Sequence, residues 1–311
     1  MTKDTDSTFT FTDPDGFVIF VRRWPAAGAA KGVVQIAHGA AEHSLRYQRL
    51  ARFLNAAGWS VYANDHRGHG ETAGTLEKAG TTGEDGWNGM VRDLKQLTDL
   101  IRAETGGLPA FLLGHSMGSL LAQRYMQLWG QELRGAVLSG SFGSMADHDQ
   151  VLAIVEPLAR SATADQPSET FAAMFSSFNQ PFAGDTGYEW LSRDTAEVQL
   201  YVDDPFCGFP FSNQMVAQLI RGAHDIWMPE NEARIPRRLP VLVISGDEDP
   251  VGGENLATLR VLVDRYRALG LRVTERYYPG ARHELFNEIN RDEVHADLLD
   301  WLNAELGNIG R

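Results

Sequence analysis

The sequence has little of several features that would place it in a large class of proteins. Among its 311 residues Cys207 is the only cysteine, so we expect neither an internal disulfide nor a zinc site built from cysteines. No apolar run approaches the roughly 18 residues of a membrane-spanning helix. Residues 1–8 are polar and lack the apolar segment of a signal peptide, so the sequence predicts a cytoplasmic protein.

Positive charge is scarce as well. Lysine and arginine together number 28 against 41 aspartates and glutamates, which gives a formal net charge of −13 and a pI near 5.1. Such an excess of negative charge disfavours nucleic acid and anionic lipid as partners. The hydrophobic fraction of 43% is ordinary, and the length allows one large domain with an insertion or two small domains. These properties suit a protein that acts on neutral or zwitterionic small molecules.

A serine between two glycines stands at the centre of the sequence, between a predicted strand and a predicted helix. Residues 110–113 form an apolar run typical of a buried strand, and from Ser119 onward apolar residues recur at helical spacing. Between them lies Gly114-His-Ser-Met-Gly118, the G-x-S-x-G pattern of a nucleophile elbow. In such an elbow a sharp turn lifts the serine hydroxyl clear of the sheet, and only glycines fit on either side. The pattern therefore makes Ser116 the candidate nucleophile.

Strands and helices alternate along most of the chain. The first two strands are joined by the turn residues 13–16 and predict an antiparallel hairpin. The later strands alternate with helices, which predicts right-handed crossovers and a mostly parallel sheet with helices on both faces. Ser44 is the expected N-cap of the first helix. The expected strands are 7–12, 17–24, 32–37, 59–64, 110–113, 135–139, 239–245 and 271–278, and the main helices after the first are 86–102, the one beginning near 119, 255–269 and 292–306.

This alternation stops between residues 142 and 230. The segment has no strand pattern, its helical patches are short, and it holds 12 of the 30 aromatic residues. We therefore expect a core domain made of residues 1–141 and 231–311, with residues 142–230 as a mainly helical cap. The aromatic side chains either form the small core of the cap itself or offer an apolar inner face to a ligand.

Two further side chains follow predicted strand ends in an order that suits Ser116. Asp249 and His283 each come just after a strand, and ligands bind parallel sheets at the carboxyl ends of the strands. A serine hydroxyl needs an imidazole to take its proton, and the imidazole needs a carboxylate to orient it. The chain order Ser, Asp, His is that of the hydrolase fold which carries the elbow. Spacing alone leaves Asp247 as an alternative to Asp249.

The negative charge that develops on the substrate also needs hydrogen-bond donors. The backbone N–H of Met117, directly after the serine, is one candidate, and that of Ala40, in the loop after strand 32–37, is the other. The remaining histidines are expected to have structural or hydrogen-bonding roles. They are His38, His43, His66, His69, His115, His148, His224 and His295.

Five separate motifs together resemble a known family. They are His38-Gly-Ala-Ala-Glu-His-Ser, Asp65-His-Arg-Gly-His-Gly, Gly114-His-Ser-Met-Gly, Gly246-Asp-Glu-Asp-Pro and Gly280-Ala-Arg-His-Glu. The sequence resembles the α/β-hydrolases of the monoacylglycerol lipase and lysophospholipase group, also called serine aminopeptidase S33-like hydrolases, from about Gly32 to the last helix.

The resemblance adds several expectations to those drawn from the residues. It implies the α/β-hydrolase fold, with Asp249 as the acid of the triad and Ala40 and Met117 as the oxyanion donors. It also implies a cap that shields an acyl-chain tunnel and docks on membranes or micelles. Cys207, Phe142 and Phe206 become candidate substrate-binding residues, although Cys207 equally fits the role of a small buried apolar residue.

The expected function is hydrolysis of a small-molecule carboxylic ester through an acyl-serine intermediate, with no metal or organic cofactor. The expected substrates are monoacylglycerol-like or lysophospholipid-like esters. One alternative is an aminopeptidase, which would need carboxylates in the cap to hold a substrate ammonium group. The candidates for that task are Glu156, Asp165, Glu169, Asp185 and Glu189. A non-catalytic lipid-binding protein on the same fold is the third reading.

Overall fold

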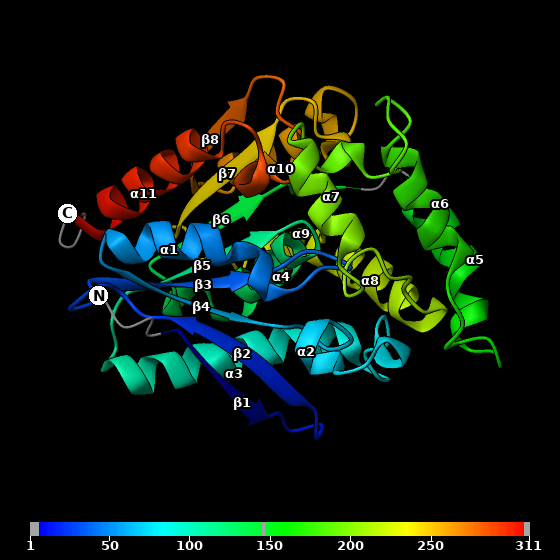
Figure 1. Ribbon diagram of the computed structural model, residues 1–311, viewed down its shortest axis with the longest axis horizontal. Helices are drawn as coiled ribbons and strands as arrows, with labels where there is room; N and C mark the ends of the chain where they lie inside the picture. The colour runs from blue at the N-terminus through cyan, green and yellow to red at the C-terminus, as the bar shows by residue number, and fades with distance from the viewer. Residues whose placement is uncertain (1–5, 145–146, 308–311) are drawn as a thin grey trace.

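The computed structural model describes residues 6–144 and 147–307, and its centre is one eight-stranded sheet (Figure 1). The strand order across the sheet is β1-β2-β4-β3-β5-β6-β7-β8. The pairs β1–β2 and β2–β4 are antiparallel and all the later pairs are parallel, so the predicted sheet is confirmed. The strands are β1 (Ser7–Thr12), β2 (Val18–Trp24), β3 (Gly32–Ala37), β4 (Trp59–Asn64), β5 (Ala110–His115), β6 (Gly135–Ser139), β7 (Pro240–Gly246) and β8 (Arg272–Tyr278).

Alternate residues of the central strands supply two apolar cores, one on each face of the sheet. Phe111 and Leu113 of β5 pack with α1 (Gln48–Ala56) and α11 (Arg291–Gly307). Leu112 packs instead with α3 (Gly86–Thr105), α4 (Met117–Trp129) and α10 (Ala257–Ala268). Successive side chains of a strand point to opposite faces, so an unbroken apolar strand needs cover on both. The expected helices on both faces are therefore confirmed.

The start of the first helical segment differs from the prediction. Ser44 is not an N-cap but the first residue of a 3-10 turn, η1 (Ser44–Tyr47), which leads into α1. The N–H of Ser44 donates to the Asp65 carboxylate (2.8 Å). The Asp65 carboxylate, from the loop after β4, thus accepts a backbone N–H at the start of this helical segment, which is the role expected of the serine hydroxyl. The other short helical segments of the core are α2 (Gly70–Ala73), η2 (Leu76–Lys78), η3 (Gly130–Glu132), η5 (Pro250–Gly252), η6 (Glu254–Leu256) and η7 (Leu285–Asn287).

Residues 142–230, called the insertion from here on, connect β6 to β7. In the part of this segment that the structure describes, which leaves out residues 145 and 146, there is no strand beyond a single bridge between Pro167 and Ser212. α5 and α6 lie at the edge of the molecule farthest from the two termini (Figure 1). The helices are α5 (His148–Ala159), α6 (Glu169–Phe178), η4 (Glu189–Leu191), α7 (Thr195–Asp203), α8 (Asn213–Ile226) and α9 (Pro229–Glu232), the last of which crosses the expected boundary.

A mainly helical insertion is thereby confirmed, whereas the division into a core domain and a cap remains a prediction. The expected outer bounds of the core at residues 1 and 311 lie outside the described residues, as does most of the polar start at residues 1–8. None of the described helices combines the length and the apolar character that crossing a membrane requires.

Candidate active site

Ser116 lies in the sharp turn between β5 and α4, as the G-x-S-x-G pattern predicts. Its backbone has φ 53° and ψ −122°, a conformation that residues other than glycine rarely adopt. A Cβ on Gly114 would lie 2.3 Å from the carbonyl oxygen of Gly118, and one on Gly118 would lie 2.0 Å from that of Ala37. The turn therefore admits no side chain at either glycine. Backbone strain of this kind is found most often at active sites.

His283 and Asp249 reach the same end of the sheet from the loops after β8 and β7. His283 Nδ1 lies 3.0 Å from both carboxylate oxygens of Asp249, and both residues are buried. The Asp249 carboxylate also accepts a hydrogen bond from the N–H of Val251 (2.9 Å). His283 and Ser116 line one small cavity. The structure thus brings the three predicted side chains to one place, with the second ring nitrogen of His283 not engaged by Asp249.

The competing carboxylate, Asp247, lies elsewhere in the same loop. It is exposed and accepts a hydrogen bond from the N–H of Gly280 (2.6 Å). This contact ties the loop after β7 to the loop after β8. Asp249, and not Asp247, is the carboxylate that contacts His283.

The pKa values of the two histidines next to Ser116 are shifted in opposite directions. Burial disfavours the charged form of His283, but the Asp249 carboxylate outweighs burial and raises the pKa of His283 above its ordinary value. Burial, with His283 as a further cause, lowers the pKa of His115 to about 4. The two rings lie 4.6 Å apart. His283 is therefore the better proton acceptor of the pair at neutral pH.

Two backbone N–H groups beside Ser116 have no acceptor among the described residues. They belong to Ala40, in the loop after β3, and to Met117, the first residue of α4. The loop runs directly beside the serine, because a Cβ on Gly39 would lie 3.2 Å from that of Ser116. The Glu42 carboxylate holds the loop by accepting a hydrogen bond from the N–H of Gly39 (2.6 Å). Unpaired N–H groups of this kind can stabilise an oxyanion.

The cavity at Ser116 is narrow, with about 10 Å³ of free space, which is about the room that one water molecule needs. Part of its lining comes from the insertion. Trp190 is buried, its ring lies 4.9 Å from that of His283, and its indole N–H has no partner among the described residues. The described lining residues are Gly39, Ala40, Glu42, His115, Ser116, Phe175, Trp190, Leu191, Tyr201, His283 and Glu284.

A buried ionic group forms one wall of this cavity, and sequence reasoning missed it. Arg46 donates from one guanidinium nitrogen to Glu42 (2.9 Å) and from another to Glu284 (2.7 Å). Tyr47 donates its hydroxyl hydrogen to Glu42 (2.8 Å). Burial opposes ionisation of Glu42, but Arg46 and nearby histidines outweigh it and lower its pKa to about 2. The only signal in the sequence was that Glu42 and Glu284 lie inside two of the five motifs.

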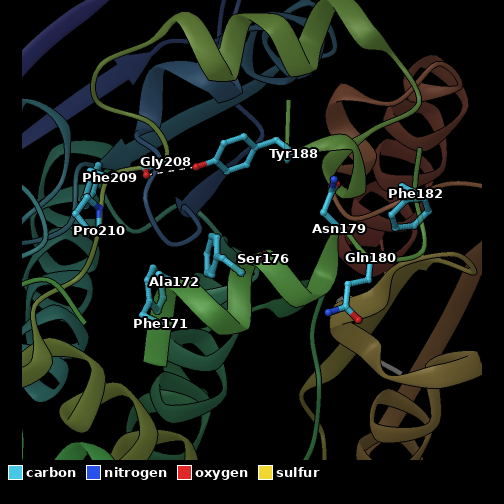
Figure 2. Close-up of a pocket in the computed structure, with 12 residues that line it drawn as sticks. Phe171, Ala172, Ser176, Asn179, Gln180, Phe182, Tyr188, Gly208, Phe209 and Pro210 are labelled. Atoms are coloured by element: carbon cyan, nitrogen blue, oxygen red, sulfur yellow. Dashed lines mark hydrogen bonds between the residues drawn. The ribbon is translucent and has the colours of Figure 1, made fainter. Parts of the chain in front are cut away.

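A second, larger cavity of about 500 Å³ lies within the insertion (Figure 2). Phe175 of α6 lines both this cavity and the one at Ser116. Tyr188 donates a long hydrogen bond to the carbonyl oxygen of Gly208 (3.5 Å) across one side of the cavity, as Figure 2 shows. Its described lining residues are Phe171, Ala172, Phe175, Ser176, Asn179, Gln180, Phe182, Gly187, Tyr188, Gly208, Phe209 and Pro210.

The three residues proposed to bind substrate line neither of these two cavities. Phe142 packs on Trp227 with the ring centroids 5.5 Å apart. The N–H of Phe206 donates to the Asp204 carboxylate (2.8 Å). Cys207 is partly buried beside His43 and Asp204. Their role in substrate binding remains a prediction.

The carboxylates that an aminopeptidase would need do not line the cavity at Ser116 in the described structure. Glu156 pairs with Arg160 and with Arg221 on the surface of the insertion. Glu189 accepts hydrogen bonds from Thr186 and Asn179. The two glutamates that do line the cavity with Ser116, Glu42 and Glu284, are both paired with Arg46.

Comparison with known proteins agrees with this geometry. Residues 28–290 match the family described as serine aminopeptidase, S33. A monoacylglycerol lipase of Mycolicibacterium smegmatis is 30% identical, covering 98% of this chain and 100% of that protein. A monoglyceride lipase of Homo sapiens is 29% identical, covering 95% and 90% of the two chains.

A solved structure supports the same assignment. The thermostable carboxyl esterase of Bacillus coagulans in complex with glycerol superimposes with a TM-score of 0.90 at 27% identity, covering 97% of this chain and 99% of that chain. The family match spans most of the sequence, and the elbow, the sheet order and the helical insertion are those of the fold. The chain belongs to the serine aminopeptidase S33 family of α/β-hydrolases and is a serine hydrolase.

Proposed function

We propose that this protein hydrolyses monoacylglycerol-like carboxylic esters through an acyl-serine intermediate. One observation carries the proposal: the cavity at Ser116 is lined by an ionic group and, through Phe175, adjoins a large aromatic cavity. A monoacylglycerol has the same division, with hydroxyl groups on one side of its ester and an apolar chain on the other. The names of the curated relatives support the same substrate class.

In the proposed mechanism Ser116 attacks the ester carbonyl while His283 takes its proton. Asp249 orients the imidazole and stabilises the imidazolium that forms. The N–H groups of Ala40 and Met117 donate to the oxyanion. His283 then returns the proton to the leaving alcohol, and a water molecule, activated by the same histidine, releases the acid.

The ionic wall is proposed to bind the alcohol part of the substrate. Glu42 and Glu284 can accept hydrogen bonds from substrate hydroxyl groups, while Arg46 keeps both carboxylates in place. Two carboxylates and one guanidinium leave an excess of negative charge. That excess repels a phosphate, so glycerol esters are favoured over lysophospholipids.

The insertion is proposed to act as a cap, with its large cavity holding the acyl chain. The cavity at Ser116 has too little room for an ester and its alcohol, so the insertion must shift for substrate to enter. Membrane or micelle contact through the cap is supported by Ile154 and Leu158, whose side chains are exposed one helical turn apart on α5. A cytoplasmic location stays a prediction.

The proposal is tested by comparing three substrates with purified protein: a monoacylglycerol, a lysophosphatidylcholine and an aminoacyl anilide. We expect turnover mainly on the monoacylglycerol and its loss to the uncatalysed level in Ser116→Ala, which should retain the wild-type melting temperature. Turnover on the anilide alone would assign the protein to the aminopeptidases. Absence of turnover on all three would favour a non-catalytic binding protein.

A further inference from the structure

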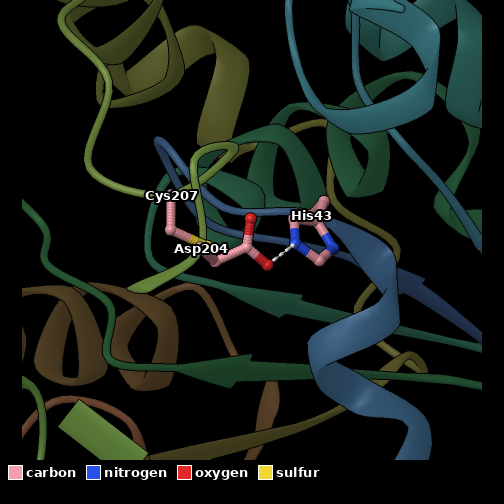
Figure 3. A group of neighbouring side chains, drawn as sticks. All are labelled: His43, Asp204 and Cys207. Atoms are coloured by element: carbon pink, nitrogen blue, oxygen red, sulfur yellow. Dashed lines mark hydrogen bonds and ion pairs between the residues drawn. The ribbon is translucent and has the colours of Figure 1, made fainter. Parts of the chain in front are cut away.

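A side-chain cluster outside the Ser116 cavity joins the core to the insertion. It consists of His43, from the loop that also carries Ala40, and of Asp204 and Cys207, from the turn after α7 (Figure 3). The Nε2 atom of His43 lies 2.9 Å from Oδ2 of Asp204, and Figure 3 shows this contact. One nitrogen, one carboxylate oxygen and the Cys207 sulfur all lie within 4.8 Å of one another.

We propose that His43, Asp204 and Cys207 form a binding site for a divalent cation of the zinc class. Imidazole, carboxylate and thiolate are the three ligand types that zinc takes in proteins, and three protein ligands leave a fourth position for water. The thiolate excludes magnesium and calcium, which prefer oxygen ligands alone. The metal would take the place of the hydrogen that His43 and Asp204 now share.

The backbone holds the ligands from both sides of the site. The N–H of Phe206 donates to Oδ1 of Asp204, and the N–H of Cys207 donates to the Asp204 carbonyl oxygen (3.0 Å), so one tight turn presents two ligands. The carbonyl oxygen of Ala41, two residues before His43, accepts hydrogen bonds from the N–H of Gly208 (2.9 Å) and the hydroxyl of Tyr201 (3.0 Å). These bonds fix the turn against the loop, so the site is already assembled before a metal arrives.

Distances and access also suit a metal. Zinc bonds of about 2.0–2.3 Å place tetrahedral ligand atoms about 3.3–3.7 Å apart. Contraction from at most 4.8 Å requires only small rotations of the Asp204 and Cys207 side chains. The Asp204 side chain is 33% exposed and offers the entry path, whereas that of His43 is 10% exposed. Metal binding must release the thiol proton.

The test uses the full-length protein and cadmium, a zinc substitute whose bond to a thiolate absorbs in the ultraviolet. Because Cys207 is the only cysteine, any such band must arise from this residue. We expect a charge-transfer band that saturates at one cadmium per chain and is absent in Cys207→Ser. Competition with zinc should remove the band.

The variants His43→Ala and Asp204→Ala decide whether the cysteine acts alone. We expect each to weaken cadmium binding at least tenfold. The conservative variants His43→Gln and Asp204→Asn are measured beside them. The melting temperature of every variant confirms that it folds. The matched control is His224→Ala, which removes one member of a stacked histidine pair elsewhere (His148 and His224, centroids 4.3 Å apart) and should leave the affinity unchanged. No band, an unchanged affinity in the folded His43 variants, or a loss of affinity in His224→Ala would overturn the proposal.

Discussion

Asp247 and Asp249 stand two residues apart in one loop, yet they have different partners: Gly280 for the first and His283 for the second. We predict that Asp249→Asn lowers kcat by about 10⁴-fold, the size seen when a triad carboxylate loses its charge and the imidazole its correct tautomer. Asp247→Asn removes the same charge nearby without touching His283 and should keep kcat within about tenfold. Steady-state kinetics of the two variants checks this, and an equal loss in both would remove Asp249 from the triad.

The second prediction concerns pH. Asp249 raises the pKa of His283, and the proposed mechanism needs His283 neutral. Turnover should therefore be lost as the pH falls through a midpoint above the ordinary histidine value of about 6.5. The measurement is kcat/KM against pH, with circular dichroism at each pH to exclude unfolding.

The origin of that shift can be isolated by NMR. In Asp249→Asn the imidazole of His283 loses its carboxylate partner, so its titration midpoint should move to lower pH. A kinetic midpoint at or below the ordinary value, or an unmoved midpoint in the variant, would contradict the assigned cause.

The site residues that directly follow strands could be predicted from the sequence, whereas the ionic wall could not. Ser116 and Asp249 each follow a strand that its apolar run makes recognisable, and His283 follows β8, in which exposed and half-buried residues alternate. Arg46 and Glu284 are 238 positions apart in the sequence, and their contact arises only when η1 and the loop after β8 meet. No local pattern encodes a pair formed by tertiary packing.

At the scale of elements, α6 carries the residue shared by the two cavities. We predict that Phe175→Trp, which adds bulk at this junction, lowers kcat/KM at least tenfold for a palmitoyl ester relative to a butyryl ester. In Phe175→Ala, kcat/KM for the palmitoyl ester relative to the butyryl ester should instead be at least that of the wild type. Hydrolysis rates across a series of chain lengths provide the measurement.

The matched control for this pair is Phe53→Trp, a partly buried phenylalanine of α1 that lines neither cavity. It should change the rates for all chain lengths alike. If Phe175→Trp changes the rates for all chain lengths by the same factor, the large cavity does not bind the acyl chain.

Elements of the core were predicted more closely than those of the insertion. Strands such as β3 and β4 have an apolar run closed by polar loop residues, and both ends coincide with the prediction. In the insertion short helices are held by contacts between aromatic rings, such as the stacked pair Phe171 and Phe211 (4.2 Å). Such contacts have no period in the sequence. The Ser44 cap was misplaced for a similar reason, because the carboxylate that accepts the Ser44 N–H belongs to Asp65, 21 positions later in the sequence.

At the scale of the whole molecule, α5 presents apolar side chains at its outer edge. Ile154 is 58% exposed and Leu158 is 38% exposed. Burying each in a micelle would contribute about 1 kcal/mol or more, so Ile154→Ser with Leu158→Ser should weaken vesicle binding about tenfold or more. Hydrolysis of a water-soluble short-chain ester should be unaffected. Vesicle sedimentation and hydrolysis of the short-chain ester check this.

The control for the docking prediction is Val18→Ser. Val18 is an equally exposed apolar residue (55%) on β2, outside the insertion. It should bind vesicles as the wild type does. Equal losses in the control and in the α5 variant would mean that exposed apolar residues anywhere on the molecule act alike, and that α5 is no docking site.

The confined space around Ser116 also bears on how the acyl group is released. If the insertion closes again once the first alcohol has left, the space beside the acyl-serine has room for about one water molecule. In the closed form a second alcohol does not fit there, whereas water does. We expect the closed cavity to act as a size filter on the acceptor and to direct the acyl group toward the free acid rather than toward a new ester.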